Sequence, residues 1–299
     1  MSASDERPDA LKSAAAPVAL ETAGEVCRPL ITVIVPVFNE AATVAVTLGR
    51  VWTEPTEKEI VIVDDGSRDG TDDAIADWIA KLNLQDASNV SRVAWLRHDS
   101  NQGKGSSIRT GLSYASGRFV VVQDADLELH PDSYSALMEP LLNGDADIVI
   151  GIRTASRTIN TMLHRVGVWL LGKLAYYVHG YAIRDAACCY KVVSLKNLRK
   201  MQLTAREFDF CPEVIGKAAR LKLKLAEVPV AYFPRHMYDG KKLRLVWDGG
   251  MAIATLIRAR FWKPMMDDGC HESESTEQIA TADCVAELNF SPTTEASAE

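Results

Sequence analysis

Two carboxylates stand two residues apart where an apolar run ends near the middle of the chain. The segment VQDADLE occupies residues 122–128 and contains Asp124 and Asp126. Carboxylates are costly to bury without partners, so this pair favours a loop. In a loop the pair can bind one hard cation, because Mg²⁺ takes one or two protein carboxylates and completes its shell with water and substrate phosphates. The structural alternative is an exposed turn in which Asp124 caps the following segment.

A second acidic segment, VIVDDGSRDGTDD, occupies residues 61–73. A carboxylate at the end of a strand, such as Asp65, can accept hydrogen bonds from ribose hydroxyls or from a base N–H. Asp69 and Thr71 instead favour turn chemistry, with Thr71 as a helix N-cap followed by acids in the first turn. The two interpretations are compatible, since Asp65 can bind a ligand while the later residues serve the turn.

The third segment, NQGKGSSIRTG at residues 101–111, is rich in glycine. Gly103 and Gly105 allow a close approach to the backbone, and the helix predicted after them favours anions at its N-terminus. Lys104 adds positive charge. The pattern GxxxxGK[ST] is missing, so this is not a Walker A loop. An ordinary turn from a loop into a helix is the alternative.

The elements that must position these residues alternate between apolar and amphipathic runs. Strands are predicted at residues 31–36, 59–65, 91–97, 118–126 and 146–151, and helices at 40–51, 71–82, 131–142 and from the turn at 101–105 through 114. The second half predicts one long helix or a broken pair at 158–180, strands at 186–193 and 222–230, and helices at 207–221 and 245–263. This alternation predicts an α/β fold with a mainly parallel central sheet and helices on both faces.

Polar clusters follow the carboxyl ends of the predicted strands. They are Asn39 and Glu40, Asp64 to Asp69, His98 to Lys104, and Asp124 to Glu128. Ligands of such sheets bind beyond the carboxyl ends of the strands, so four clusters at one edge predict a site there.

Composition and charge limit the class of protein and its domain organisation. The 299 residues are 47% hydrophobic and 24% charged, which excludes a mostly disordered or fibrous chain. No run reaches the ~18 apolar residues of a membrane span, and the N-terminal residues do not resemble a secretory signal. Residues 267–299 contain nine acids and no Lys or Arg, so the net charge of −7 belongs to the ends of the chain and leaves about +4 on the body. We expect a flexible leader at 1–29, one domain at 30–266 and an acidic disordered tail at 267–299.

The six cysteines form no CxxC pattern and no zinc spacing with histidine. They predict reduced thiols in a cytoplasmic protein.

Four segments together resemble family 2 glycosyltransferases, the nucleotide-diphospho-sugar transferases of GT-A fold. They are PVFNE (36–40), DDGSRDGT (64–71), NQGKGSSIRTG (101–111) and QDADLE (123–128), in the order and spacing of that family, and the likeness covers about residues 30–155. Later segments, at 184–193, 206–215, 226–230 and 235–249, resemble the polyprenyl-phosphate hexosyltransferases of the dolichol-phosphate mannose synthase and dolichyl-phosphate glucosyltransferase type. Cys189 stands where that group usually has Gly, and the Gln-x-x-Arg-Trp pattern of processive polymerases is absent.

The resemblance implies roles for particular residues in a nucleotide-sugar-binding half at 30–155. Three of them, Pro36, Phe38 and Glu40, would line the nucleotide pocket. Asp65 would reach the base or ribose, and Lys104 would assist in donor binding. The metal site for Mg²⁺ or Mn²⁺ would consist of Asp124, Asp126 and Glu128, with Asp126 nearest the ion and Glu128 where relatives often have Gln.

The acceptor half, at 156–266, contributes two further groups by the same resemblance. The basic residues Arg235, Lys241 and Lys242 would close over the donor pyrophosphate, although a solvated charge run is the structural alternative. Asp185 would serve as a general base if the acceptor is a hydroxyl, and a phosphate acceptor would need none. As an Asp that follows Arg184, it could equally form an ion pair.

The predicted function is inverting transfer of a hexose from a nucleotide-diphospho-sugar, UDP-glucose or GDP-mannose, to a polyprenyl phosphate at the cytosolic membrane face. The alternatives are a sugar or other hydroxyl acceptor, a nucleotidyltransferase, and a catalytically silent sugar-nucleotide-binding protein. The apolar segments at 166–178 and 251–263 fit either a peripheral membrane contact or a packed core or dimer surface. Nothing predicts a nucleic-acid partner, and an oligomer stays open.

Overall fold

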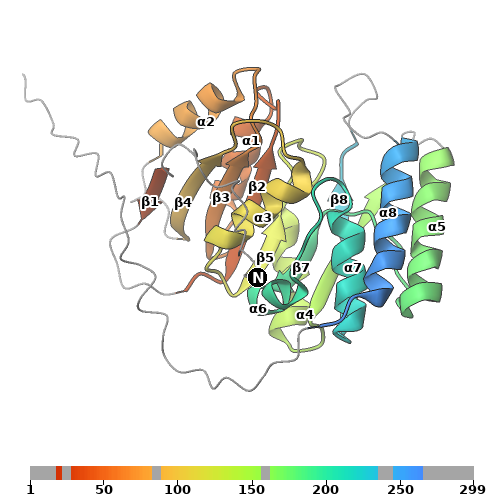
Figure 1. Cartoon of the computed structure of the whole chain (residues 1–299). Coiled ribbons are helices and arrows are strands. Elements are labelled where there is room, and N and C mark those ends of the chain that lie inside the picture. The colour runs from red at the N-terminus through yellow and green to blue at the C-terminus, as the bar shows by residue number, and fades with distance from the viewer. Residues whose placement is uncertain (1–17, 22–27, 83–88, 156–161, 235–244, 265–299) are drawn as a thin grey trace, which may run out of the picture. The chain divides into compact units, whose positions relative to one another are not determined.

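The computed structural model describes residues 18–21, 28–82, 89–155, 162–234 and 245–264, all within the first of two compact units, Met1–Met265 (Figure 1). The predicted acidic tail lies outside the described residues, so its boundary stays a prediction.

One sheet of eight strands forms the centre of the described residues, in the spatial order β1-β4-β3-β2-β5-β7-β6-β8. The strands are β1 (Val18–Glu21), β2 (Ile31–Val37), β3 (Lys58–Asp64), β4 (Val90–Arg97), β5 (Phe119–Val122), β6 (Ile148–Ala155), β7 (Lys191–Ser194) and β8 (Leu225–Tyr232). β4, β3, β2 and β5 pair in parallel, as do β6 and β8, whereas β1 and β7 are antiparallel to their neighbours. The prediction of a mainly parallel sheet is confirmed.

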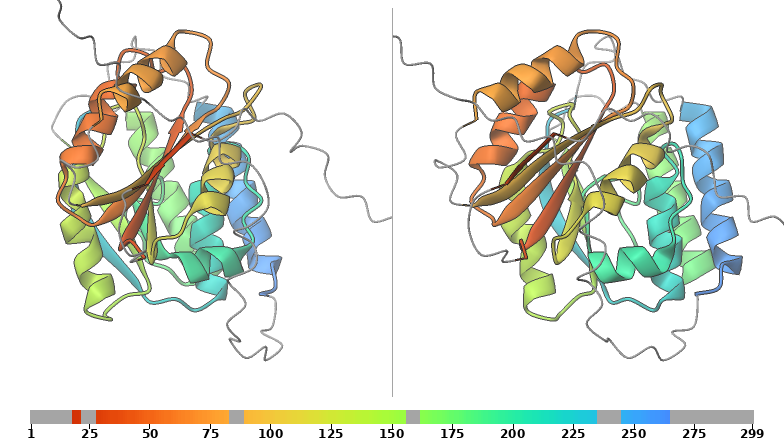
Figure 2. Two further views of the ribbon diagram at one scale, coloured as in Figure 1. Left: turned by 90° about the vertical axis from the view of Figure 1, so that its left-hand side faces the viewer. Right: turned by 60° about the vertical axis from the view of Figure 1, so that its left-hand side comes forward.

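Helices cover both faces of the sheet, because successive residues of a buried strand point to opposite sides. On β2, Val33 and Val35 belong to a core with Leu48, whereas Ile34 joins a second core with Ile108. The first core includes α1 (Val44–Thr53), α2 (Thr71–Ala80) and α4 (Tyr134–Leu142), and the second includes α3 (Lys104–Tyr114), α6 (Leu195–Met201) and α7 (Phe210–Arg220). Figure 2 shows the two layers on either side of the sheet. This arrangement confirms the predicted α/β fold.

Two further helices lie outside the second layer. α8 (Leu245–Phe261) packs on α7, and α5 (Met162–His179) packs on α8 and α7. α5 is one helix, which resolves the choice left open at 158–180. No helix among the described residues combines the length and apolar character needed to cross a bilayer.

The structure corrects two predicted strands. The strand predicted at 118–126 ends at Val122, and a loop follows it that carries the three acids of the predicted metal site. The strand predicted at 186–193 begins only at Lys191. The Lys191 ammonium donates to the carbonyls of Ala186 (3.2 Å) and Cys188, which folds the preceding residues into a turn.

Two other elements were not predicted from the sequence. Strand β1 lies inside the predicted flexible leader and pairs with β4. The short helix α6 follows β7 directly, and the Ser194 side chain caps it by accepting from the Asn197 N–H (3.2 Å).

Candidate active site

The loop after β5 lies at the carboxyl edge of the sheet and presents Asp124, Asp126 and Glu128. Asp124 forms an ion pair with Lys104, the first residue of α3. Burial alone would raise the pKa of Asp124, but the Lys104 ammonium lowers it overall. Lys104 also donates to Cys189 Sγ (2.9 Å), the thiol that replaces the usual Gly. The Gly-rich turn and the acidic loop are therefore joined by a charged contact.

Asp126 lies in an excess of negative charge. Burial, and then the nearby carboxylates of Asp124 and Glu128, raise its pKa to about 7. The Glu128 N–H donates to Asp126 Oδ1 (3.0 Å) and orients it. A bound cation would offset this unfavourable charge.

The donor set fits a hard divalent cation with few protein ligands. Within the described part of the chain, no three acidic, histidine or cysteine side chains gather as a ready-made metal cluster. Mg²⁺ does not need one, because water and substrate phosphates complete its shell. Asp126 and its acidic neighbours can therefore hold the ion together with a bound donor.

Asp65 is engaged by the protein itself. The residue is 3% exposed, and its carboxylate accepts from the backbone N–H groups of Gln102 (2.9 Å) and Gly103 (2.8 Å). It also contacts His98 Nδ1 (2.7 Å), whose other ring nitrogen lies 3.0 Å from the Thr110 hydroxyl oxygen. Asp65 thus holds the Gly-rich loop at the end of β3, and its contact with a base or ribose stays a prediction.

The PVFNE segment is tied to the DDGSRDGT segment. Pro36 is buried in β2, whereas Phe38 and Glu40 are half-buried beyond it. The Asn39 N–H donates to Ser67 Oγ (2.9 Å), and the Glu40 N–H donates to Thr71 Oγ1 (2.8 Å). Two loops that the resemblance assigns to one nucleotide pocket therefore lie side by side.

The predicted N-cap of α2 is wrong. The helix begins at Thr71, with Gly70 in the N-cap position and a left-handed backbone (φ 86°). Asp69 takes over the capping chemistry, since its carboxylate accepts from the Thr71 N–H (3.1 Å) and hydroxyl (2.5 Å).

Asp185 forms an ion pair, but not with the adjacent Arg184. Arg153 donates to both of its oxygens, from Nε (2.7 Å) and Nη2 (2.8 Å). Burial would raise the pKa of Asp185, and Arg153 lowers it overall. Arg184 pairs instead with Glu227 (3.1 Å). The base role stays a prediction, and Arg153 is a partner that competes for that carboxylate.

Two further residues of the site escaped the sequence analysis. Arg153 lies within β6, two residues beyond the strand predicted at 146–151, so a charged residue just after that predicted strand was the signal that could have identified it. Tyr232 stacks under the Arg153 guanidinium (5.2 Å to the ring centre) and donates to Glu128 Oε2 (3.0 Å). Arg235, Lys241 and Lys242 lie outside the described residues.

Fold and site together define a glycosyltransferase of GT-A fold. The family model described as "Glycosyl transferase family 2" matches residues 32–200. The chain belongs to this family and is an enzyme that transfers glycosyl groups.

Two relatives named as lipid-phosphate glycosyltransferases match most of the chain. The chain is 26% identical to the undecaprenyl-phosphate mannosyltransferase of Micrococcus luteus over 238 residues, 77% of this chain and 92% of that one. It is 26% identical to the dolichyl-phosphate beta-glucosyltransferase of Dictyostelium discoideum over 266 residues, 82% of this chain and 78% of that one.

Among solved structures, glucosyl-3-phosphoglycerate synthase from Mycobacterium tuberculosis, in complex with Mn²⁺, UDP-glucose and phosphoglyceric acid, matches with a TM-score of 0.55. The sequence identity is 20%, and the match covers 78% of this chain and 80% of that one. This likeness supports the fold.

Proposed function

We propose that the chain moves a hexose from a nucleotide-diphospho-sugar to a polyprenyl phosphate, with inversion and with Mg²⁺ or Mn²⁺ bound. UDP-glucose and GDP-mannose are the donors to test first. The observation that carries the proposal is the acidic loop after β5, where Asp126 lies beside Asp124 and Glu128 while Lys104 contacts the first of them. The names of the two curated relatives support a lipid-phosphate acceptor.

The described residues suit a reaction in which a nucleoside diphosphate leaves. A bound divalent cation would supply charge stabilisation at the leaving pyrophosphate. Lys104 is held charged, since Asp124 and Cys189 raise its pKa above the ordinary value against the opposing effect of burial. The N-terminus of α3 begins at the same residue and favours anions. These groups would orient the donor phosphates, and Arg235, Lys241 and Lys242 remain proposed as a closing basic segment.

The donor half of the proposal is tested by calorimetry. UDP-glucose and GDP-mannose are titrated with Mn²⁺ and with chelator, using the wild type and Asp126→Asn. Binding of one donor that needs both the metal and Asp126 is expected, since an amide cannot supply the lost charge. If the folded protein binds neither donor, the result favours either a different sugar nucleotide as donor or the alternative of a catalytically silent sugar-nucleotide-binding protein.

The identity of the acceptor, phosphate or hydroxyl, is tested at Asp185. A phosphate acceptor is already anionic and needs no base, which agrees with a carboxylate whose oxygens both accept from Arg153. Asp185→Asn should therefore keep measurable transfer to a polyprenyl phosphate, with the loss largely in acceptor KM. Glu227→Gln, which weakens the neighbouring pair with Arg184, is the matched control. Complete loss of kcat in Asp185→Asn with intact donor binding would favour a hydroxyl acceptor.

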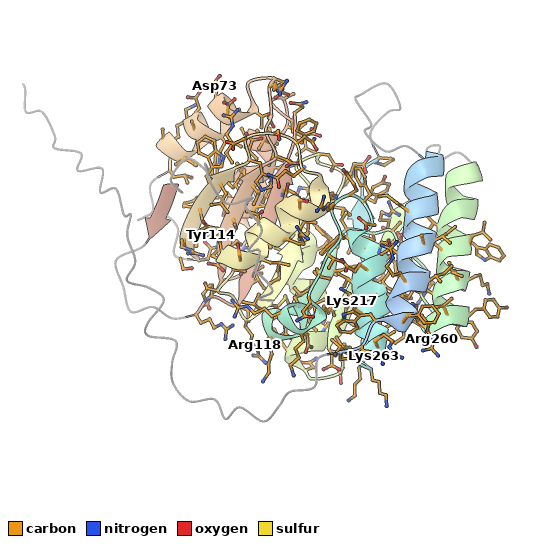
Figure 3. The ribbon with its side chains drawn as sticks, in the orientation of Figure 1. Asp73, Tyr114, Arg118, Lys217, Arg260 and Lys263 are labelled. Atoms are coloured by element: carbon orange, nitrogen blue, oxygen red, sulfur yellow. The ribbon has the colours of Figure 1, made fainter. Side chains whose placement is uncertain are left out.

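A peripheral membrane contact completes the proposal, with the cytosolic face as the expected side. The outer helices α5 and α8 expose large apolar side chains, among them Trp169 (59%), Tyr177 (80%) and Phe261 (78%). Exposed basic residues lie close by, and Figure 3 shows Arg260 and Lys263 at one end of α8. Exposed aromatic and basic side chains on outer helices are typical of binding at a lipid interface.

A further inference from the structure

The amide of Gln123 is buried (0% exposed) directly before the acidic loop. Its nitrogen donates to the carbonyls of Asp124 and Leu129, both at 3.1 Å. Its oxygen accepts from the hydroxyls of Tyr134 (2.8 Å) and Tyr190 (2.5 Å). Carbonyls cannot donate, so the orientation of the amide is fixed, and its two N–H groups and two lone pairs are all used.

Those two carbonyls lie at the two ends of the loop that carries the acids. One side chain therefore spans the mouth of the loop between Asp124 and Leu129. Within this loop, Leu127 has a left-handed backbone (φ 62°), a conformation that residues other than Gly and Asn rarely adopt. Such strain persists only where surrounding contacts hold it.

Other parts of the fold fasten the same loop. The Thr47 hydroxyl, from α1, donates to the Ala125 carbonyl (3.1 Å), and the Phe233 N–H, after β8, donates to the Glu128 carbonyl (2.8 Å). Gln123 provides the two bonds that close the loop upon itself. Tyr134 begins α4, whereas Tyr190 precedes β7, so the amide also joins segments far apart in the chain.

We propose that Gln123 is a positioning residue for the cation: it fixes the backbone of residues 124–129 so that the Asp126 and Glu128 carboxylates are presented before the ion arrives. The inference rests on the proposed metal-dependent function. A purely structural Gln123 would stabilise the fold and leave the affinity for the cation unaffected.

The test separates metal affinity from folding. Mn²⁺ affinity is measured by electron paramagnetic resonance with UDP or GDP present, and the unfolding midpoint is measured alongside. The informative variant combines Gln123→Leu with Tyr134→Phe and Tyr190→Phe. It removes the tether and leaves no unpaired hydroxyl, while the Asp124 and Leu129 carbonyls lose the amide that donates to them. A carbonyl without its donor lowers stability, which is why the unfolding midpoint is measured separately from the Mn²⁺ affinity.

The triple variant should bind Mn²⁺ roughly 10–100-fold more weakly, as is usual when groups that orient metal ligands are removed. Leu137→Ala is the matched control, because Leu137 is buried in α4 and makes none of these hydrogen bonds. It should lower the unfolding midpoint and keep the Mn²⁺ affinity.

Two outcomes would overturn the inference in distinguishable ways. Equal Mn²⁺ affinity in the wild type and a folded triple variant shows that Gln123 is structural only. Failure of the wild type itself to bind Mn²⁺ with either nucleotide overturns the proposed metal site, and the inference with it.

Discussion

Glu59 shows how a single side chain can hold three strands together at the end of the sheet away from the site. It is 1% exposed in β3 and accepts from Thr32 of β2 (2.5 Å), Arg92 of β4 (2.8 Å) and the Ser116 hydroxyl (2.8 Å). Burial would raise its pKa, but the hydrogen bonds from Thr32 and Ser116 and the charge of Arg92 lower it overall. The group is therefore a stabilising anion.

Replacement of Glu59 by Gln should destabilise the protein by about 2–3 kcal/mol at pH 7, because hydrogen bonds to a charged group are the strong ones. A carboxyl whose folded pKa is lowered stabilises above its unfolded pKa, and this contribution disappears as pH falls through the folded value. Urea unfolding of wild type and variant from pH 7 to pH 3 checks this. A difference that stays constant over that range would contradict the assignment.

The sequence predicted where the candidate residues lie better than it predicted their partners. Residue type and position at a strand end predicted that Asp65, Asp124 and Asp126 lie at one edge of the sheet, where the structure has them. The pair of Asp185 with Arg153 and the bonds of Gln123 join residues distant in the chain, and periodicity carries no information about such pairs.

At the scale of elements, the Gly-rich turn fits closely against the segment before α7. Gly103 has a left-handed backbone (φ 94°), and a Cβ there would lie 2.3 Å from the Arg206 carbonyl oxygen. At Gly105, in the first turn of α3, a Cβ would lie 2.7 Å from the Ala205 carbonyl oxygen. Backbone cannot yield as a flexible side chain can, so these glycines allow the turn that carries Lys104 to lie directly against residues 205 and 206.

Gly105→Ala should therefore lower stability by about 1–3 kcal/mol and weaken donor binding. Gly49→Ala, in α1, is the matched control, because no atom lies within 4 Å of a Cβ at that position. The control should gain about 0.5–1 kcal/mol, the usual advantage of Ala over Gly in a helix. Thermal unfolding and donor titration of both variants test the contrast, and equal behaviour would refute the close fit.

Long elements were predicted well because their periodicity extends over two or more turns or five or more strand residues. The failures were short or local. β1, β7 and α6 have too few residues for a periodic signal. β5 ends at Val122; the Gln123 N–H still donates to the Ile34 carbonyl (2.9 Å), and the chain then turns into the acidic loop.

At the scale of the whole molecule, the exposed apolar side chains of α5 and α8 are proposed to contact a lipid surface. The combined variant Trp169→Ser, Tyr177→Ser and Phe261→Ser should lose binding to vesicles that contain anionic lipid, because it removes the apolar contacts. Vesicle binding by the wild type should also weaken as salt is added, because salt screens the attraction between anionic lipid and the basic residues Arg258 and Arg260 of α8.

Co-sedimentation with vesicles measures both effects. Leu142→Ser is the control, an exposed apolar residue (49%) at the end of α4 on the other side of the sheet. Wild-type protein that stays in the supernatant at low salt, or a Leu142→Ser variant that loses binding equally, would contradict the membrane assignment.

The place of β7 in the sheet has a consequence for synthesis on the ribosome. β5 pairs with β2 on one side, but its other neighbour is β7, which begins only at Lys191. At about 5–20 residues per second, the emerging chain waits roughly 3–14 s between the two strands. Through that interval the open side of β5 is available to chaperones or to a neighbouring nascent chain. Slower translation between the two strands should lower the yield of folded enzyme more than slower translation after β8.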